Sequence, residues 1–281
     1  MSSQLTSLQK ANLNWSVRTE NVISESGILI PEYKTIIRND TNKSLGIRGK
    51  DYGVFQNSEL MELLDRVSAR SGLHIHTGGS FDGGAKVWVQ LKSNDLKIGN
   101  DTVKGFLTGI NSFDGSTSLA FGPSNITMSC TNKFFSTFRN METKIRHTKN
   151  IIVRVEDLMK ELDKTMEEEK VMFQHIIHLS ETSIGKYDID NTLRTLFNLK
   201  DGVDLKDEEN VSSITRSRLS SLSVDMAGEI KDKGKNLWGL FSGVTKYTTH
   251  SMNKGENDKQ KMFGLYGNRE RKIFSDLVGL V

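Results

Sequence analysis

The stretch of the chain that most limits its possible folds runs from about residue 72 to residue 150. It contains five runs with the composition or alternation of β-strands, at 73–77, 85–91, 105–110, 116–121 and 126–130. Turn signals separate the first four runs: a glycine-rich tip at 78–84, which reads as a flexible hairpin tip, and the dipeptide Asp114-Gly115. Strands joined by such short connections pair antiparallel. We therefore predict an α+β fold built on a curved antiparallel β-sheet that is rich in hairpins.

A helix is predicted to follow this sheet. Apolar residues recur every three or four positions from Ile152 to Ile176, which predicts one long amphipathic helix over 151–179. The stripe suits either a core face or a self-association seam, and a sheet needs a helix to cover it. Before the sheet, the sequence predicts short strands at 15–23 and 33–37, a strand and loop at 46–55, and a helix that begins near Asn57 and ends at Gly72.

The organisation of the chain changes near residue 180. Residues 1–180 are predicted to form the α+β core, and residues 181–281 a mostly helical C-terminal region. Within that region we expect a helix at 187–199, a polar stretch at 200–222 whose composition allows mobility, and two helical pieces after residue 236. A polar loop at 253–261 should separate those two pieces.

Composition limits the compartment and says little about partners. The chain of 281 residues has a formal net charge of only +3 and one cysteine, Cys130, so no disulfide can form within it. It has no apolar run of membrane-spanning length, and its first residues lack the apolar core of a signal peptide. We therefore expect a cytoplasmic protein with no membrane partner.

Charge is concentrated locally even though the net charge is small. Residues 131–154 contain a single acid, Glu142, and phenylalanines lie among the basic side chains. Sites that follow a nucleic-acid backbone combine cations for the phosphates with aromatic rings for the bases. The aromatic rings could equally be core residues, and the sequence leaves both readings open. The candidate nucleic-acid-binding residues here are Lys133, Phe134, Phe138, Arg139, Lys144, Arg146, His147, Lys149 and Arg154, and a second strip offers Arg48 and Lys50.

Catalytic and metal-binding patterns are weaker. His74 and His76 could share one face of a strand and bind zinc together with Cys130 or His147, but no second closely spaced ligand pair exists. The glycine-rich tip lies between strands and matches neither the phosphate-binding loop nor the dinucleotide fingerprint. No nucleophile elbow or paired carboxylate is present. We therefore predict no metal, no cofactor and no enzymatic activity.

Several segments resemble a family of phage and plasmid proteins that is catalogued as a domain of unknown function, number 932. They are K-D-Y-G-V-F-Q-N (50–57), H-T-G-G-S-F-D-G-G-A-K-V-W-V (76–89), N-S-F-D-G-S (111–116), C-T-N (130–132), I-R-H-T (145–148) and W-G-L-F-S-G-V-T-K-Y-T-T-H (238–250). The resemblance extends from about Trp15 to His250. It implies a mobile-element protein that acts in the cytoplasm of a bacterial host cell. The motif residues Asn111 and Asn132 are expected to fix turns.

A second resemblance concerns architecture alone. A hairpin-rich antiparallel sheet followed by one long helix is similar to the core of the RecT and Redβ single-strand annealing proteins, which act without ATP as rings or filaments. It implies a homo-oligomeric recombination protein that binds and anneals single-stranded DNA, with a phage exonuclease or a host protein as a further partner. Phe134, Phe138 and Trp88 would then stack on bases.

Two other functions stay open. The first is a host-takeover or anti-defence factor that binds a bacterial protein through the long helix and the apolar segment 238–247. The second is an enzyme acting on nucleic acid through the motif residues His76, Asp114, Asn132 and His147. The sequence assembles no catalytic constellation for that enzyme.

Overall fold

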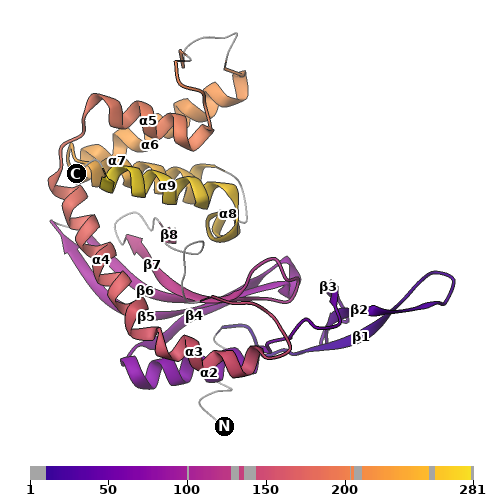
Figure 1. The fold of residues 1–281 in the computed structure, drawn as a ribbon. Helices are drawn as coiled ribbons and strands as arrows, with labels where there is room; N and C mark the ends of the chain where they lie inside the picture. The colour runs from indigo at the N-terminus through magenta and orange to yellow at the C-terminus, as the bar shows by residue number, and fades with distance from the viewer. Residues whose placement is uncertain are drawn as a thin grey trace. The chain divides into compact units, whose positions relative to one another are not determined.

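The computed structural model describes residues 11–99, 101–127, 133–135, 144–202, 204–205, 211–252 and 257–279 (Figure 1). The chain divides into two compact units that are not contiguous in sequence. The first comprises Met1–Ser93, Phe106–Gly122 and Asn140–Glu167, and the second comprises Asn94–Gly105, Pro123–Arg139 and Glu168–Val281. The architecture is α+β with antiparallel pairing, as the sequence predicts, and the C-terminal region is helical.

A three-stranded sheet opens the first unit. Its strands are β1 (Val17–Ile23), β2 (Leu29–Arg38) and β3 (Ser44–Gly49), in that order and antiparallel. They correspond to the three strands expected before residue 55. At its inner end, buried Val17 and Ile36 join the core of the first unit.

The second sheet contains the strands predicted at 73–77, 85–91 and 105–110, whereas the run at 116–121 and the start of the run at 126–130 belong to a single strand. Residues 128–130 of the last run lie outside the described residues. Its order is β4 (His74–Phe81), β5 (Lys86–Ile98), β6 (Asp101–Ser112), β7 (Leu119–Thr127) and β8 (Lys133–Phe135), and β9 (Lys144–Ile145) also pairs with β7. The pairs β4–β5, β7–β8 and β7–β9 are antiparallel. Strands β5, β6 and β7 contribute residues to both units.

The hairpin tip is shorter than the glycine-rich stretch 78–84 that the sequence predicts for it. Gly78 and Gly79 lie within β4, paired with Val89 and Trp88. The turn itself is only the short 3₁₀ segment Asp82–Gly84. The reason is packing: a Cβ on Gly79 would lie 3.3 Å from the Trp88 ring, so the glycine provides the space that the indole occupies.

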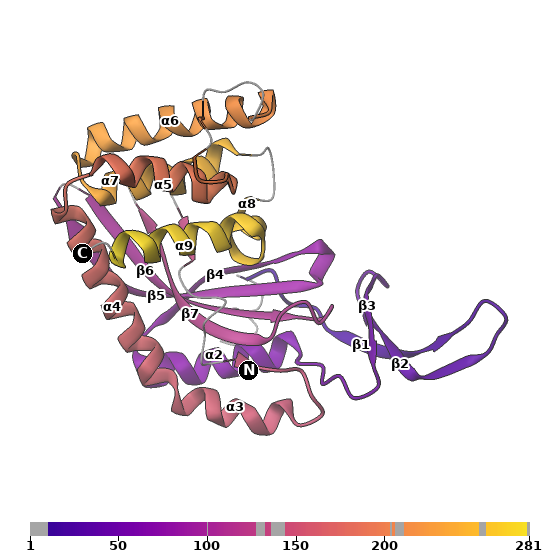
Figure 2. The same cartoon turned by 45° about the horizontal axis from the view of Figure 1, so that its top comes forward.

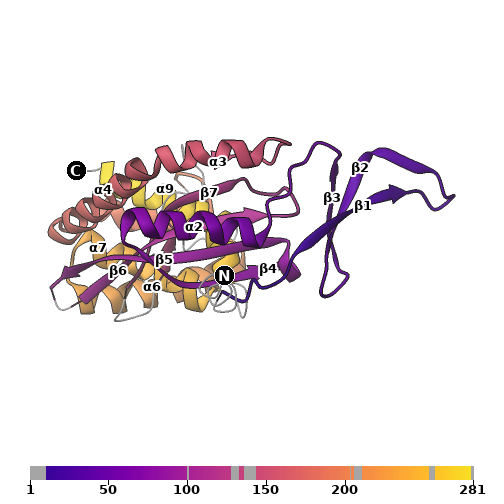
Figure 3. The same cartoon turned by 90° about the horizontal axis from the view of Figure 1, so that it is seen from below.

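Two helices of the first unit lie side by side (Figure 3). Helix α2, Asn57–Ser71, ends at Gly72 in the left-handed conformation that the glycine predicts. Helix α3, Ile151–Lys160, is joined to α2 by a bidentate ion pair in which both terminal nitrogens of Arg66 contact Glu156, at 2.8 and 2.9 Å.

The single long helix expected at 151–179 is two helices. Helix α3 ends at Lys160, and α4 begins at Leu162 and runs to Glu181. The apolar stripe that the sequence shows as continuous serves two cores. Val155 and Met159 belong to the core cluster of the first unit, whereas Met172 and Ile176 belong to that of the second.

The second unit is mainly helical (Figure 2). Its helices are α5 (Lys186–Phe197), α6 (Ser213–Lys233), α7 (Leu237–Lys246), the π-helical turn η2 (Tyr247–Ser251), α8 (Asn257–Phe263) and α9 (Leu265–Gly279). Gly243 lets α7 approach α6, because a Cβ there would lie 2.4 Å from the Cα of Met226. No helix within the described part of the chain is long and apolar enough to cross a membrane.

Two segments expected to be irregular are helical. The second half of the polar stretch 200–222 belongs to α6, because Leu219, Leu222 and Met226 form a buried stripe and Ser212 caps the helix by accepting a hydrogen bond from the Thr215 N–H at 3.2 Å. The polar loop expected at 253–261 is helical from Asn257, whose side chain donates to the Thr249 carbonyl at 2.8 Å.

Candidate functional site

Asp114 is the centre of a polar cluster in the first unit. Its Oδ2 accepts a hydrogen bond from the Lys86 ammonium group at 2.9 Å, and that ammonium group also contacts Asp82 at 3.1 Å. The other carboxylate oxygen of Asp114 accepts from the backbone N–H and the hydroxyl group of Ser116, at 2.9 and 2.5 Å. Asp114, which the sequence predicts as a turn residue, thus links its own turn at 114–116 to the turn at Asp82–Gly84.

These hydrogen bonds keep Asp114 ionised. Burial by itself raises the pKa of the carboxyl group, but the hydrogen bonds from Ser116 and Lys86 outweigh burial, so the pKa of Asp114 is lowered. A carboxylate held in this way is a fixed negative charge at neutral pH. It holds the partly buried Lys86 in place.

Tyr52 and His147 form the aromatic part of the same cluster. Their rings stack with centroids 4.9 Å apart and planes 13° apart. The Tyr52 hydroxyl donates to the Ser112 carbonyl at 2.8 Å, and burial raises the pKa of Tyr52 to about 12. The cluster therefore includes a neutral phenol that is anchored to the end of β6.

His147 is a largely buried neutral imidazole. Its Nδ1 lies 3.1 Å from the Gly53 carbonyl, which can only accept, so Nδ1 carries the proton. Burial lowers the pKa of His147, which keeps the ring uncharged at neutral pH. Its Nε2 is buried and has no hydrogen-bond partner within the described residues.

Gly53 brings together two segments that are distant in the sequence. Its N–H donates to the His147 carbonyl at 3.3 Å, and a Cβ at this position would lie only 2.0 Å from the Thr148 carbonyl oxygen. Only glycine fits so close an approach of two backbones. The motifs K-D-Y-G and I-R-H-T are thus the two sides of one contact.

Basic side chains surround this contact. Arg48 is half-buried, and a Cβ on Gly115 would lie 2.6 Å from its Nε, which has no hydrogen-bond partner within the described residues. Lys50, Arg146, Lys149 and Arg154 are exposed. Lys149 pairs with Asp51 and thereby lowers the pKa of that carboxyl group. Arg146 and Arg154 form no ion pair within the described ranges.

The structure describes some of the other predicted contact residues and leaves others outside the described ranges. Lys144 lies in β9 and is half-buried. Lys133 and Phe134 belong to strand β8, paired with Ile126 and Asn125 of β7. Phe138 and Arg139 lie outside the described residues, as do Cys130 and Asn132.

Trp88 and His76 lie on the second sheet. Trp88 is half-buried across from Gly79, and its ring stacks with Phe81 at a centroid distance of 6.4 Å. His76 on β4 is exposed and lies 5.2 Å from Phe106, measured between ring centroids. No group of three or more potential metal ligands occurs within the described part of the chain.

Residues 44–270 match the family described as Domain of unknown function (DUF932). The chain belongs to this family. The search of curated proteins and the search of solved structures found no match. The part of the chain that matches DUF932 includes every residue of the polar cluster, whereas β1 and β2 precede it.

Sequence reasoning missed some residues that hold the cluster together. Lys86 is the lysine of F-D-G-G-A-K, and no simple spacing rule links it to Asp114. No sequence pattern singles out Arg38 and Lys43, which donate to the carbonyls of Gly83 and Asp82 at 3.1 and 3.4 Å. Asn111 was expected to fix a turn, but it lies buried within β6, and its side chain donates to the distant Phe55 carbonyl at 2.9 Å.

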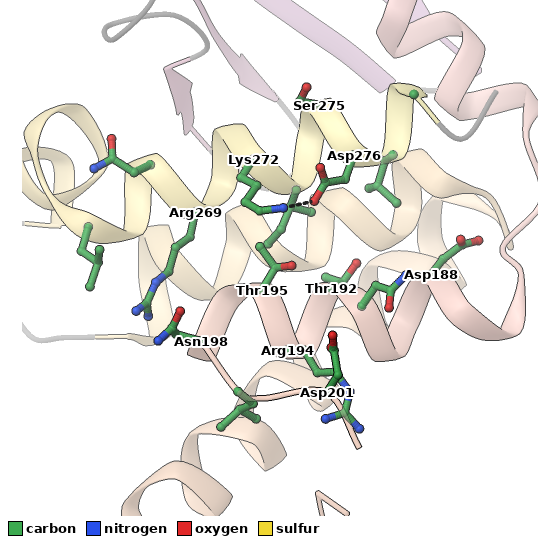
Figure 4. Close-up of a pocket in the computed structure, with 17 residues that line it drawn as sticks. Asp188, Thr192, Arg194, Thr195, Asn198, Asp201, Arg269, Lys272, Ser275 and Asp276 are labelled. Carbon is green, nitrogen blue, oxygen red and sulfur yellow. Dashed lines mark hydrogen bonds and ion pairs between the residues drawn. The ribbon is translucent and has the colours of Figure 1, made fainter. Parts of the chain in front are cut away.

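The second unit of this DUF932 chain contains a groove of about 1120 Å³ between α5 and α9 (Figure 4). Its charges balance and are largely satisfied internally. Lys272 pairs with Asp276 at 2.8 Å, and Arg269 donates to the Leu196 carbonyl at 2.8 Å. The groove therefore offers no surplus of free cations to a nucleic acid.

Proposed function

We propose that this protein binds single-stranded DNA at the basic surface around the Gly53–His147 contact and anneals complementary strands as an ATP-independent, oligomeric recombination protein. The observation that carries the proposal is the convergence of two basic strips. Arg48 and Lys50 come from β3 and the loop after it, and Arg146 and Lys149 come from the segment before α3. The backbone hydrogen bond between Gly53 and His147 joins the two strips.

The physical argument is electrostatic. Each phosphate that a lysine or arginine neutralises releases condensed counterions, which drives binding at low salt. Exposed cations are suited to this role because they keep their hydration until DNA arrives. The Lys149–Asp51 ion pair is also exposed, and water and salt weaken such a pair, so a phosphate can replace Asp51.

The aromatic and polar residues have supporting roles in this proposal. Tyr52 and His147 stack on each other and are largely buried, so they position the basic residues. His147 already donates through Nδ1 to Gly53, and only its unpartnered Nε2 remains for a donor group of a ligand. Base stacking is assigned to Trp88, Phe134 and Phe138.

The likeness to the annealing proteins is part of the proposal and rests on architecture alone. The antiparallel sheet, with helices after it in the chain, supports it in outline, whereas the single long helix of the likeness is divided into α3 and α4 here. The same proposal includes a curved second sheet and a phage exonuclease as a partner.

The host-factor alternative has less support. Trp238, Phe241 and Tyr247, from the segment that would supply its contact surface, are each at most 2% exposed within the core of the second unit. As folded, they offer no surface to a bacterial protein. The enzyme alternative is supported only by the proximity of Asp114 to His147. His76, a third residue of that alternative, lies against Phe106.

Direct binding tests the proposal. A fluorescent single-stranded oligonucleotide should bind at 50 mM salt and lose on the order of tenfold or more in affinity at 200 mM. The protein should also speed the pairing of two complementary strands in the absence of ATP. Absence of binding at low salt would overturn the proposal, and salt-sensitive binding without faster pairing would limit it to DNA binding.

A further inference from the structure

We infer that Lys34 and Arg48 together hold one phosphate group of the DNA backbone, and that the planar end of the Arg48 guanidinium group makes the specific contact. This role rests on the proposed function and adds to it a residue, Lys34, and a way of holding one phosphate. Lys34 lies in β2 and Arg48 in β3, and the strand register places the two residues directly opposite each other. We call this pair the phosphate seat.

The phosphate seat places two like charges side by side. Directly opposed residues of an antiparallel pair share a face of the sheet, with Cβ atoms about 5 Å apart, and like charges in this position destabilise the sheet. The side chains of Lys34 and Arg48 form no hydrogen bond or ion pair with any other residue that the structure describes. A bound anion would supply the partner that both cations lack and relieve their repulsion.

Arg48 is fixed at its stem and free at its end. Its Nε is buried against the D-G-S turn, where a Cβ on Gly115 would lie only 2.6 Å away. The neighbouring acid, Asp114, does not pair with Arg48, because its carboxylate oxygens accept hydrogen bonds from Lys86 and Ser116. The D-G-S motif therefore orients the half-buried guanidinium group and leaves its charge available to a ligand.

The chemistry of the seat suits a phosphate of the DNA backbone. The fork of an arginine matches two oxygens of a phosphate, and a guanidinium group that is already oriented loses little entropy on binding. Lys50 and Glu32 lie next to the seat, joined by a backbone hydrogen bond of 2.8 Å, and their opposite charges leave the excess positive charge of Lys34 and Arg48 unchanged. Arg48 also lies near Tyr52, so the seat adjoins the basic surface at the Gly53–His147 contact.

The test uses two variants of the full-length protein, each with a matched control. Arg48→Lys keeps the charge and removes the planar fork, and Arg146→Lys makes the same change at an exposed arginine. Lys34→Gln removes one charge of the seat, and Lys231→Gln does so at an exposed lysine of the second unit. Circular dichroism and thermal melting check the folding of each variant. Lys34→Gln should melt no lower than the wild type, because it removes a like-charge repulsion.

The first readout is the affinity for a fluorescent single-stranded oligonucleotide at several salt concentrations. Arg48→Lys should bind on the order of tenfold more weakly than the wild type, because a lysine cannot replace both hydrogen bonds, whereas Arg146→Lys should stay within about twofold. Lys34→Gln should lower the slope of log affinity against log salt by about 0.7, and Lys231→Gln should leave the slope unchanged. A folded Arg48→Lys or Lys34→Gln variant that binds like its control would overturn the inference.

A second readout separates the phosphate seat from the proposed function. If the wild type binds no DNA, the proposed function fails, and the melting temperature in inorganic phosphate, compared with chloride at equal ionic strength, decides whether the seat exists. A rise in the wild type that is smaller in both Lys34→Gln and Arg48→Lys, but not in their controls, would support a seat for free phosphate in place of DNA. Equal rises in all five proteins would overturn the seat as well.

Discussion

His147 stacks on Tyr52, with the two ring centroids 4.9 Å apart. The Nδ1 of His147 also hydrogen-bonds to the carbonyl of Gly53, the neighbour of Tyr52, 94 residues away in the sequence. This stack brings the loop after β3 against the segment before α3. The backbone hydrogen bond between Gly53 and His147 joins the segment that carries Arg48 and Lys50 to the segment that carries Arg146 and Lys149.

Gly53→Ala should separate the two segments. The added Cβ would lie 2.0 Å from the Thr148 carbonyl oxygen, and relieving such an overlap costs on the order of 2 kcal/mol of unfolding free energy. Urea unfolding measures the loss, and DNA affinity should fall with it. Gly49→Ala is the matched control, because its Cβ would meet only the Glu32 carbonyl oxygen at 3.9 Å. Equal stability of the two variants would show that the Gly53 contact is unimportant.

Asp114→Asn should leave Lys86 without one of its two carboxylate partners and lower the free energy of unfolding by roughly 2 kcal/mol. Asp276→Asn, which breaks the exposed pair with Lys272, should cost about 1 kcal/mol or less. Because the pKa of Asp114 is lowered in the folded state, its stabilisation is present above the unfolded pKa of about 3.9.

That stabilisation is lost as the pH falls through the lower folded pKa. The difference between the wild type and Asp114→Asn should therefore be full at pH 7 and shrink below about pH 4. Unfolding curves measured across this range provide the check. A difference independent of pH would mean that the carboxylate charge is not what stabilises the cluster.

The sequence predicts elements well where one pattern dominates and poorly where tertiary packing decides. Helix α2 ends at Gly72 as predicted because a left-handed glycine stops a helix locally. Strand β4 extends through Gly78 and Gly79, where a side chain would meet Ala11 at the first position and the Trp88 ring at the second, and no local pattern indicates these contacts. The helix expected at 151–179 divides at Glu161 because its apolar residues serve two cores.

The candidate site was predictable as residue types but not as a geometry. The basic residues at 144–154 and at 48–50 were evident, and the structure joins the two strips through Gly53. The pairing of Lys86 with Asp82 and Asp114 needed the fold, because these residues come from two turns and a strand. Phe138 and Arg139 lie outside the described residues and stay predictions.

Lys261→Met should strongly destabilise the second unit at neutral pH. Lys261 and Glu270 are both buried and lie 2.7 Å apart, and removing one partner of a buried pair costs about 3–5 kcal/mol. Burial raises the pKa of Glu270, and Lys261 opposes that rise, so loss of the lysine should raise the pKa further.

A raised folded pKa means that the buried carboxyl group favours folding below its unfolded pKa and disfavours it as the pH rises through the folded pKa. The destabilisation by Lys261→Met should therefore be smaller at pH 5 than at pH 7.5, as urea unfolding can measure. Adding Glu270→Gln to the variant should restore part of the stability at pH 7.5. Equal destabilisation at both pH values would show that the negative charge of Glu270, left without its lysine, is not the cause.

The affinity of Arg146→Ala with Lys149→Ala for a fluorescent single-stranded oligonucleotide, measured at several salt concentrations, tests the central claim most directly. Lys231→Ala with Lys235→Ala removes the same charge from two exposed lysines of the second unit and is the control. We predict about 10- to 100-fold weaker binding for the first variant at low salt. The slope of log affinity against log salt should fall by about 1.4, or about 0.7 for each lost phosphate contact, while the control stays at the wild-type value. Wild-type affinity and slope in the first variant would contradict a DNA-binding surface at the Gly53–His147 contact.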